Sequence, residues 1–212
     1  NPERPFTAII GGAKVAGKID VIKSLFDKVD NLIIGGGMAY TFAKAMGGQI
    51  GKSLIEEERV VLAKQLINSA QKKGVNLLLP TDSVNADNFN NDANTNVSSI
   101  LSIDTDYMGL DIGRDSIIKF SEAIKSSKTL IWNGPMGVFE MEKFETGTKE
   151  IGEAVCLATE NGAFSLIGGG DSAAAIKKFD FENRVSYLST GGGAMLEYLE
   201  GGSLPGVVAI LN

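Results

Sequence analysis

Short runs of apolar residues alternate along the chain with stretches of helical periodicity, and this alternation predicts the fold. Six of the runs are nearly continuous in apolar residues, which is typical of strands buried on both faces of a parallel sheet. The predicted strands cover residues 6–10, 32–34, 75–79, 130–132, 164–167 and 185–188.

The clearest helical pattern lies between Glu56 and Lys73. Ser53 and Glu56 have the spacing of a capping box, and Gly74 can close the helix. Strands that alternate with helices predict an α/β fold, a Rossmann-like three-layer sandwich with a mainly parallel central sheet. The apolar positions that share one face of this helix are Val60, Ala63, Leu66, Ile67 and Ala70.

Glycine clusters follow the predicted strands. The chain has 26 glycines, more than average usage, and α/β folds bind ligands at the carboxyl ends of their strands. We therefore expect one extended crevice lined by backbone amides. The clusters cover residues 11–12, 35–37, 133–137, 168–170 and 191–193.

The first cluster opens the segment Gly-Gly-Ala-Lys-Val-Ala-Gly-Lys at residues 11–18, between a predicted strand and a helical pattern over 19–25. Such a turn brings backbone N–H groups and a helix N-terminus to one point, where Lys14 and Lys18 add positive charge. The spacing nearly fits a P-loop, but Ile19 replaces the Ser or Thr that would bind magnesium. The segment predicts a phosphate site outside the P-loop NTPases; the alternative is an ordinary strand-to-helix turn.

Composition excludes several kinds of chemistry. Without histidine, these 212 residues hold no Ser-His-Asp triad and no His-ligated zinc. Cys156 is the single cysteine, which excludes internal disulfides, and we expect it to be a small buried hydrophobe. A net charge of −6 disfavours nucleic acid as a partner, so an anionic substrate needs a local site. No apolar run has the length of a membrane span and no signal peptide is evident, so we expect no membrane partner and a cytoplasmic location.

Residues 82–106 are rich in Asn, Asp, Ser and Thr. A window from Asp87 is faintly similar to a calcium loop, but Phe89, Asp92 and Ser98 occupy positions that require a ligand, a glycine and a glutamate. The composition favours a solvated loop or a hairpin.

Taken in order, the motifs resemble those of the phosphoglycerate kinase family, specifically its C-terminal nucleotide-binding domain. The resemblance covers residues 1–212 and implies one domain of a two-lobed kinase that lacks the N-terminal phosphoglycerate-binding lobe. It implies reversible, glycolytic phosphoryl transfer between 1,3-bisphosphoglycerate and ADP, giving 3-phosphoglycerate and ATP, with Mg²⁺ as cofactor and a monomeric protein. The isolated lobe should bind nucleotide without efficient turnover. The matching segments are 5–18, 35–39, 79–82, 108–111, 132–140, 168–172, 189–194 and 204–207.

The resemblance also implies roles for individual residues. Lys18 should contact the nucleotide phosphates, Lys14 should reach the transferred phosphoryl group, and Asp171 should hold the metal–nucleotide complex. The alternative for Asp171 is an N-cap of the following helix. The implied catalytic residues are Lys14, Lys18, Gly170 and Gly193. The implied nucleotide-binding residues are Gly12, Ala13, Lys18, Gly36, Gly37, Gly109, Leu110, Asn133, Pro135, Val138, Glu140, Gly169, Gly170, Asp171 and Ser172. Glu140 should face the ribose. The alternative for Met108 and Val138 is that they belong to the ordinary core. The residues that should form an apolar adenine slot are Gly36, Gly37, Met108, Gly109, Leu110 and Val138.

Three positions depart from the family pattern. Gly17 stands where an Asp that assists magnesium is usual, Arg114 replaces a proline, and Tyr187 replaces a common histidine near the hinge. A non-catalytic nucleotide-binding module of the same fold is therefore a second hypothesis. A third, a dinucleotide-dependent oxidoreductase, lacks the required G-x-G-x-x-G turn.

Overall fold

The computed structural model describes residues 2–201, and its centre is a six-stranded sheet in which every paired strand is parallel. β1 lies in the interior of the sheet and is buried at all its positions, as its unbroken apolar run predicts. A mainly parallel sheet is thus confirmed. In spatial order the strands are β11 (Tyr187–Ser189), β10 (Phe164–Gly168), β9 (Thr129–Asn133), β1 (Phe6–Ile10), β2 (Asn31–Ile34) and β4 (Asn76–Leu78).

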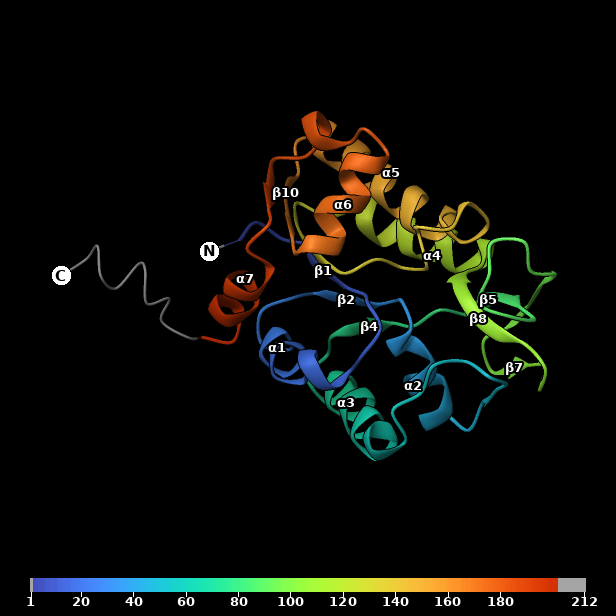
Figure 1. Ribbon diagram of the computed structural model, residues 1–212. Coiled ribbons are helices and arrows are strands. Elements are labelled where there is room, and N and C mark those ends of the chain that lie inside the picture. The colour runs from blue at the N-terminus through green and yellow to red at the C-terminus, as the bar shows by residue number, and fades with distance from the viewer. Residues whose placement is uncertain (1, 202–212) are drawn as a thin grey trace.

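Helices cover both faces of this sheet, so the three-layer arrangement is also confirmed (Figure 1). On one face α1, α2 and α3 pack against alternate residues of the strands such as Ala8 and Ile10, and α7 joins their cluster through Leu196 and Leu199. On the other face α4, α5 and α6 pack against the intervening residues such as Ile9 and Trp132. The helices are α1 (Ile19–Leu25), α2 (Met38–Ala45), α3 (Val60–Lys72), α4 (Arg114–Lys125), α5 (Thr146–Glu160), α6 (Gly170–Lys178) and α7 (Gly192–Leu199).

The polar stretch after β4 forms a hairpin beside the main sheet, as its composition favours. β5 pairs antiparallel with both β6 and β8, and β3 pairs with β7. At the hairpin tip the Asp87 carboxylate accepts hydrogen bonds from Asn88 and Asn94. These strands are β3 (Gln49–Ile50), β5 (Asp82–Ala86), β6 (Thr95–Ser99), β7 (Ser102–Ile103) and β8 (Met108–Ile112).

The predicted capping box before α3 is wrong. A 3₁₀ turn (η2, Glu57–Arg59) precedes α3, whose N-cap residue Arg59 makes no side-chain cap. The Ser53 hydroxyl instead accepts a hydrogen bond from the Gly109 amide, and Glu56 binds the loop after β1. The predicted end is confirmed: Gly74, at φ +70°, donates from its amide to Gln71.

The predicted strand over 185–188 is shifted toward the C-terminus. β11 begins at Tyr187, because Ser165 and Ser186 exchange side-chain hydrogen bonds with each other's amides where a ladder would otherwise start. A 3₁₀ turn, η4 (Glu182–Arg184), precedes β11. Besides η2 and η4, the described residues form the 3₁₀ turns η1 (Ala16–Lys18) and η3 (Glu142–Phe144). Within residues 2–201, no helix combines the length and the apolar character that crossing a bilayer requires.

Candidate functional site

Two adjoining cavities, of about 680 and 500 Å³, lie at the carboxyl ends of the sheet strands. They share Gly12, Ala13 and Asp171, so together they form one crevice. The first cavity is the more apolar. After the roles that the sequence resemblance implies, the first is called the base-side cavity and the second the phosphate-side cavity. All the residues for which the resemblance implies a catalytic or nucleotide-binding role line one of the two, and so does Gly17. On the base side these are Gly12, Ala13, Gly36, Gly37, Met108, Gly109, Leu110, Pro135, Val138, Glu140 and Asp171. On the phosphate side they are Gly12, Ala13, Lys14, Gly17, Lys18, Asn133, Gly169, Gly170, Asp171, Ser172 and Gly193.

The glycines of the base-side cavity allow close packing of its walls. A Cβ on Gly109 would lie 2.2 Å from the hydroxyl oxygen of Tyr40, which itself hydrogen-bonds Ser83. Gly36 has φ +67°, and a Cβ there would lie 2.4 Å from the Gly12 amide nitrogen. Larger residues at these positions would push the walls apart.

Sequence reasoning missed Tyr40, Leu54 and Phe89, which also line the base-side cavity. Phe89 is exposed at the hairpin tip, where a large apolar side chain in a polar stretch was an available signal. Tyr40 carried no such signal, because its position in a buried helix resembles ordinary core.

Four amides of the glycine-rich turn are bonded to protein acceptors and are not open to the crevice, contrary to expectation. The Gly11 and Gly12 amides donate to the carbonyls of Asn133 and Pro135, at 2.9 and 3.0 Å. Those of Val15 and Ala16 donate to the Glu56 carboxylate. The groups of this turn that remain for a ligand are its two lysines and the amides of Ala13, Lys14 and Gly17, for which the described structure shows no acceptor.

The N-termini of α6 and α7 supply further amides. Gly169, at φ +107°, is the N-cap of α6, and the first amide to bond within the helix is that of Ala173. The amides of Gly170 and Asp171 thus precede the helical hydrogen-bond pattern and lie beside the phosphate-side cavity, where the positive end of the helix dipole favours an anion. Gly193 occupies the corresponding place in α7.

Asp171 is not the N-cap of α6, which corrects that alternative. It lies in the first turn with an exposed side chain that, among residues 2–201, makes no hydrogen bond or ion pair. A single carboxylate beside the amides that begin α6 fits Mg²⁺, which keeps several waters and often takes only one or two protein ligands. No cluster of three or more His, Cys, Asp or Glu side chains suitable for a metal occurs in the described part of the chain.

Lys18 is held in place inside the crevice. Its Nζ donates to the Gly11 carbonyl at 2.5 Å and to the Asn133 carbonyl at 3.2 Å. Burial lowers the Lys18 pKa to about 8, and the Asp171 carboxylate opposes that shift. Lys14 is exposed and, in the described structure, makes no side-chain hydrogen bond.

Two buried polar side chains tie the strand-end loops together. Asn133 donates from Nδ2 to the Gly168 carbonyl at 2.7 Å, and the Ser172 hydroxyl accepts from the Gly134 amide at 2.7 Å. These bonds fix β9, β10 and α6 relative to one another. The Ser172 hydroxyl keeps its own hydrogen for a second partner.

Asp111 is a buried carboxyl group behind the base-side wall. Its two oxygens accept from the Gly147 amide at 2.7 Å and from its neighbour Ile112 at 2.9 Å. Burial raises the pKa of Asp111 to about 8. Cys156 is buried as expected, and burial raises its thiol pKa to about 11, which makes the thiol unreactive at neutral pH.

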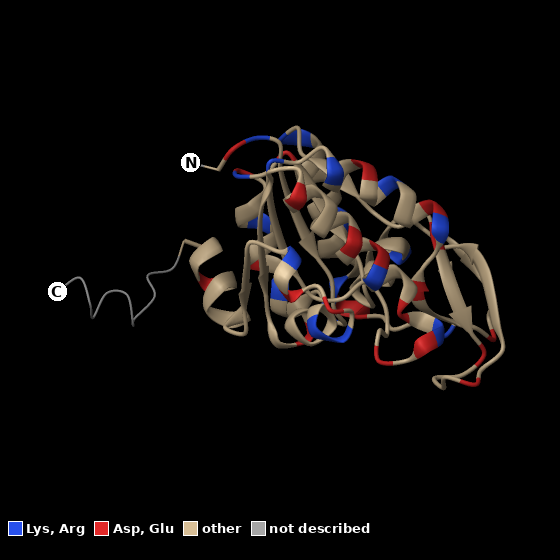
Figure 2. Cartoon of the chain, turned by 90° about the horizontal axis from the view of Figure 1, so that it is seen from above, with Lys and Arg blue, Asp and Glu red and all other residues tan. Residues whose placement is uncertain are grey.

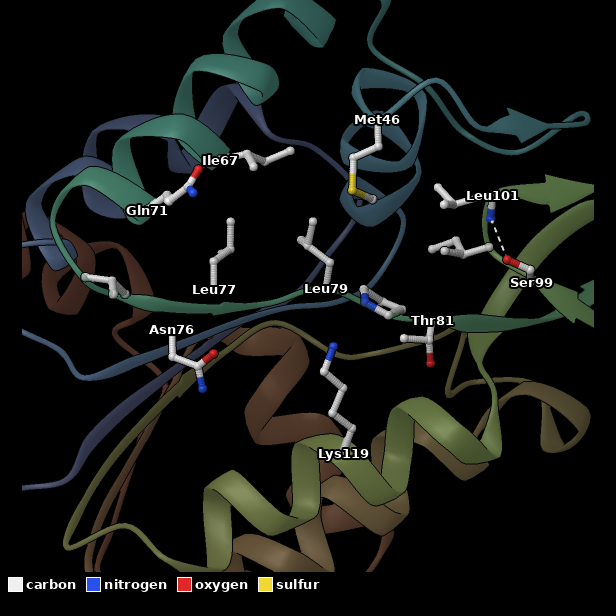
Figure 3. A pocket seen from close by; sticks show the side chains of 13 residues that line it. Met46, Ile67, Gln71, Asn76, Leu77, Leu79, Thr81, Ser99, Leu101 and Lys119 are labelled. Atoms are coloured by element: carbon white, nitrogen blue, oxygen red, sulfur yellow. Dashed lines mark hydrogen bonds between the residues drawn. The ribbon is translucent and has the colours of Figure 1, made fainter.

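Across residues 2–201, the distribution of charge does not suggest a second site. Figure 2 shows Lys and Arg interspersed with Asp and Glu along the helices. A further cavity of about 670 Å³ lies between α3 and α4 at the open edge of β4 (Figure 3). It is largely apolar, with Leu77, Leu79 and Ile67 toward its middle. Among the described residues that line it, Lys119 is the one with a charge, and none is a predicted site residue.

Comparison with known proteins agrees with this geometry. The family model described as "Phosphoglycerate kinase" matches residues 1–202. Phosphoglycerate kinases of Porphyromonas gingivalis and Chloroherpeton thalassium are 56% and 55% identical over 98% and 100% of the chain. The solved phosphoglycerate kinase of Coxiella burnetii superposes with a TM-score of 0.93 at 43% identity over 98% of the chain, and that of Pyrococcus horikoshii with 0.83 at 28% over 99%.

The chain spans about half the length of these relatives: 50% and 53% of the two sequences and 53% and 52% of the two structures. The matched half contains both cavities, including the two lysines of the phosphate-side cavity. The chain belongs to the phosphoglycerate kinase family.

Proposed function

We propose that residues 1–212 are the C-terminal nucleotide-binding domain of a phosphoglycerate kinase, which transfers a phosphoryl group reversibly between 1,3-bisphosphoglycerate and ADP. One observation carries the proposal: an apolar cavity opens through Gly12 and Ala13 into a second cavity with two lysines and two helix N-termini. An apolar cavity that leads into one lined by positive groups suits a purine base that carries a polyphosphate.

The chemistry needs positioning and charge stabilisation more than proton transfer. In the reverse direction the acceptor is a carboxylate, which carries no proton, so the absence of histidine from these residues is no obstacle. Lys18, Lys14 and the amides at Gly170 and Gly193 supply positive charge where a phosphoryl group would move.

Asp171 is the residue that would hold Mg²⁺ with the nucleotide. When bound, the metal neutralises charge on the phosphate oxygens. The nucleobase would lie among Gly36, Gly109 and Val138, and Glu140 would face the ribose.

Calorimetry with MgADP tests the binding half of the proposal. We expect binding in the 212-residue chain, and no heat at millimolar nucleotide would overturn it. A coupled assay tests turnover, which should be slight without a lobe that holds the phosphoglycerate. Robust turnover by the purified chain would show that no second lobe is needed.

The full-length protein separates this proposal from a non-catalytic nucleotide-binding module. A kinase requires a second lobe with clustered arginines to hold the phosphoglycerate, and mass spectrometry of the native protein would reveal the additional polypeptide. Binding of nucleotide without transfer in that complete protein would favour the module.

A further inference from the structure

Glu56 joins two segments that are far apart in sequence, and the function proposed above does not use it. Its Oε2 accepts hydrogen bonds from the Val15 amide and, at 3.3 Å, from the Ala16 amide. These amides follow directly after Lys14 and begin the turn η1. A carboxylate at that point satisfies donors that the turn leaves open and complements the dipole of the helical segment.

The other side of the loop is fixed by packing. Val15 is fully buried in the core cluster, so its side chain and the Glu56 bond restrain the same residue from two directions. Lys18 has separate restraints, through its bonds to Gly11 and Asn133. Within residues 2–201 the Lys14 side chain has no hydrogen bond or ion pair of its own, and its place depends on the backbone that Glu56 holds.

Glu56 is itself anchored beside the base-side cavity. Its amide donates to the Thr41 hydroxyl at 3.2 Å, and Thr41 is buried in α2 directly after the glycine turn 35–37. Two residues earlier Leu54 lines the base-side cavity, and Ser53 accepts from the Gly109 amide at 2.8 Å. The segment 53–56 therefore contacts both ends of the crevice.

We infer that Glu56 is a positioning residue that sets the direction of Lys14 by holding the Val15 and Ala16 amides. The inference rests on the proposed function, in which Lys14 reaches the transferred phosphoryl group. Losing the carboxylate frees the loop around Lys14 and leaves Lys18 in place. MgATP, which carries that phosphoryl group, should therefore lose more affinity than MgADP.

The test uses the 212-residue chain with Glu56→Ala, Glu56→Gln and Glu57→Gln. Glu57 is an exposed neighbour, so Glu57→Gln is matched to Glu56→Gln in chemistry and in charge removed. Glu56→Gln keeps an acceptor oxygen, and it takes the place of Glu56→Ala in the test if the alanine variant folds poorly. Amide hydrogen exchange followed by NMR reports on Val15 and Ala16 without any nucleotide.

Exchange at Val15 and Ala16 should accelerate about tenfold in Glu56→Ala, less in Glu56→Gln, and not in Glu57→Gln. The Kd for MgATP should rise about tenfold in Glu56→Ala, with about a twofold change for MgADP. Unchanged exchange at these amides, or equal losses for both nucleotides, would overturn the inference. If the unmutated chain bound neither nucleotide, the proposed function and the ATP effect would both fail, and exchange would still decide whether Glu56 holds the loop.

Discussion

The ammonium group of Lys18 donates a 2.5 Å hydrogen bond to the carbonyl of Gly11, the residue at which its own turn begins. The bond closes the turn and points Nζ into the crevice, where Asn133 provides a second acceptor. Lys14, four residues earlier, makes no comparable bond in the described structure. The two lysines of one motif therefore differ in how firmly they are placed.

Lys18→Ala should weaken MgADP binding more than Lys14→Ala does. Lys18 is preorganised toward ground-state phosphates, and a charge-assisted contact contributes roughly 1.5–3 kcal/mol. Titration calorimetry of both variants checks this, with thermal unfolding as the control for loss of the Gly11 bond. Equal losses of affinity would contradict the division of roles.

Nucleotide binding by the unmutated chain should weaken as pH rises above about 8. The Lys18 pKa is lowered to about 8 by burial, so the free protein loses this charge there. Bound phosphate favours the charged form, so binding near pH 8 should take up protons. Calorimetry in buffers of different ionisation enthalpy measures the uptake, and Lys18→Met should abolish it. Uptake that persists in that variant would assign it to another group.

Alanine substitutions at the two adjacent glycines at the start of α6 should have different effects, one on nucleotide affinity and the other on stability. Gly170 lines the phosphate-side cavity with an ordinary φ and open space around a Cβ, so Gly170→Ala should fold normally and lose nucleotide affinity. Gly169 has φ +107°, where a side chain is strained, so Gly169→Ala should cost about 1–3 kcal/mol of stability. Urea unfolding and MgADP titration of both variants compare the two effects. Full affinity in Gly170→Ala would mean that no ligand group approaches this residue.

Asp111 should make stability fall with rising pH. Its folded pKa is raised to about 8 from an ordinary value of 3.8, so between these limits the folded chain holds a proton that the unfolded chain releases. The contribution is fully present below about pH 4 and is lost as pH rises through 8. Asp111→Asn has no carboxyl proton to release, and its side-chain N–H₂ would face one of the two backbone amides that donate to Asp111. At low pH this variant should therefore be less stable than the unmutated chain by about 1–3 kcal/mol.

Urea unfolding of both chains from pH 5 to 9 checks the Asp111 prediction. The advantage of the unmutated chain should shrink as pH rises and then reverse, because Asp111 loses about 1.4 kcal/mol of stability for each pH unit between its unfolded and folded pKa. Effects shared by both chains, such as that of Lys18, cancel in the difference. A difference that stays constant would mean that the folded Asp111 is already ionised at pH 5, with its pKa below this range.

Sequence reasoning succeeded where local pattern and tertiary structure agree. Buried parallel strands such as β1 are unbroken apolar runs, and the glycine clusters after them could be placed at one sheet edge by topology alone. It failed where a side chain's partner comes from a distant segment. The spacing of Ser53 and Glu56 suggested a local cap, yet their partners are Gly109 and the amides of Val15 and Ala16. No local periodicity encodes such contacts.

Gly17 offers the last test, because its position lines the phosphate-side cavity and a Cβ there would meet no atom within 4 Å. The family resemblance places an Asp here that assists magnesium, which leaves Asp171 as the main protein ligand in this chain. Gly17→Asp should therefore fold normally and lower the magnesium concentration needed for half-maximal nucleotide binding. The opposing effect is repulsion between an added carboxylate and the phosphates when metal is scarce. Titrating magnesium at fixed ADP, for the unmutated chain and the variant, separates the two. A midpoint that stays in place or moves upward would mean that position 17 is only part of a turn and that its glycine has no bearing on the metal.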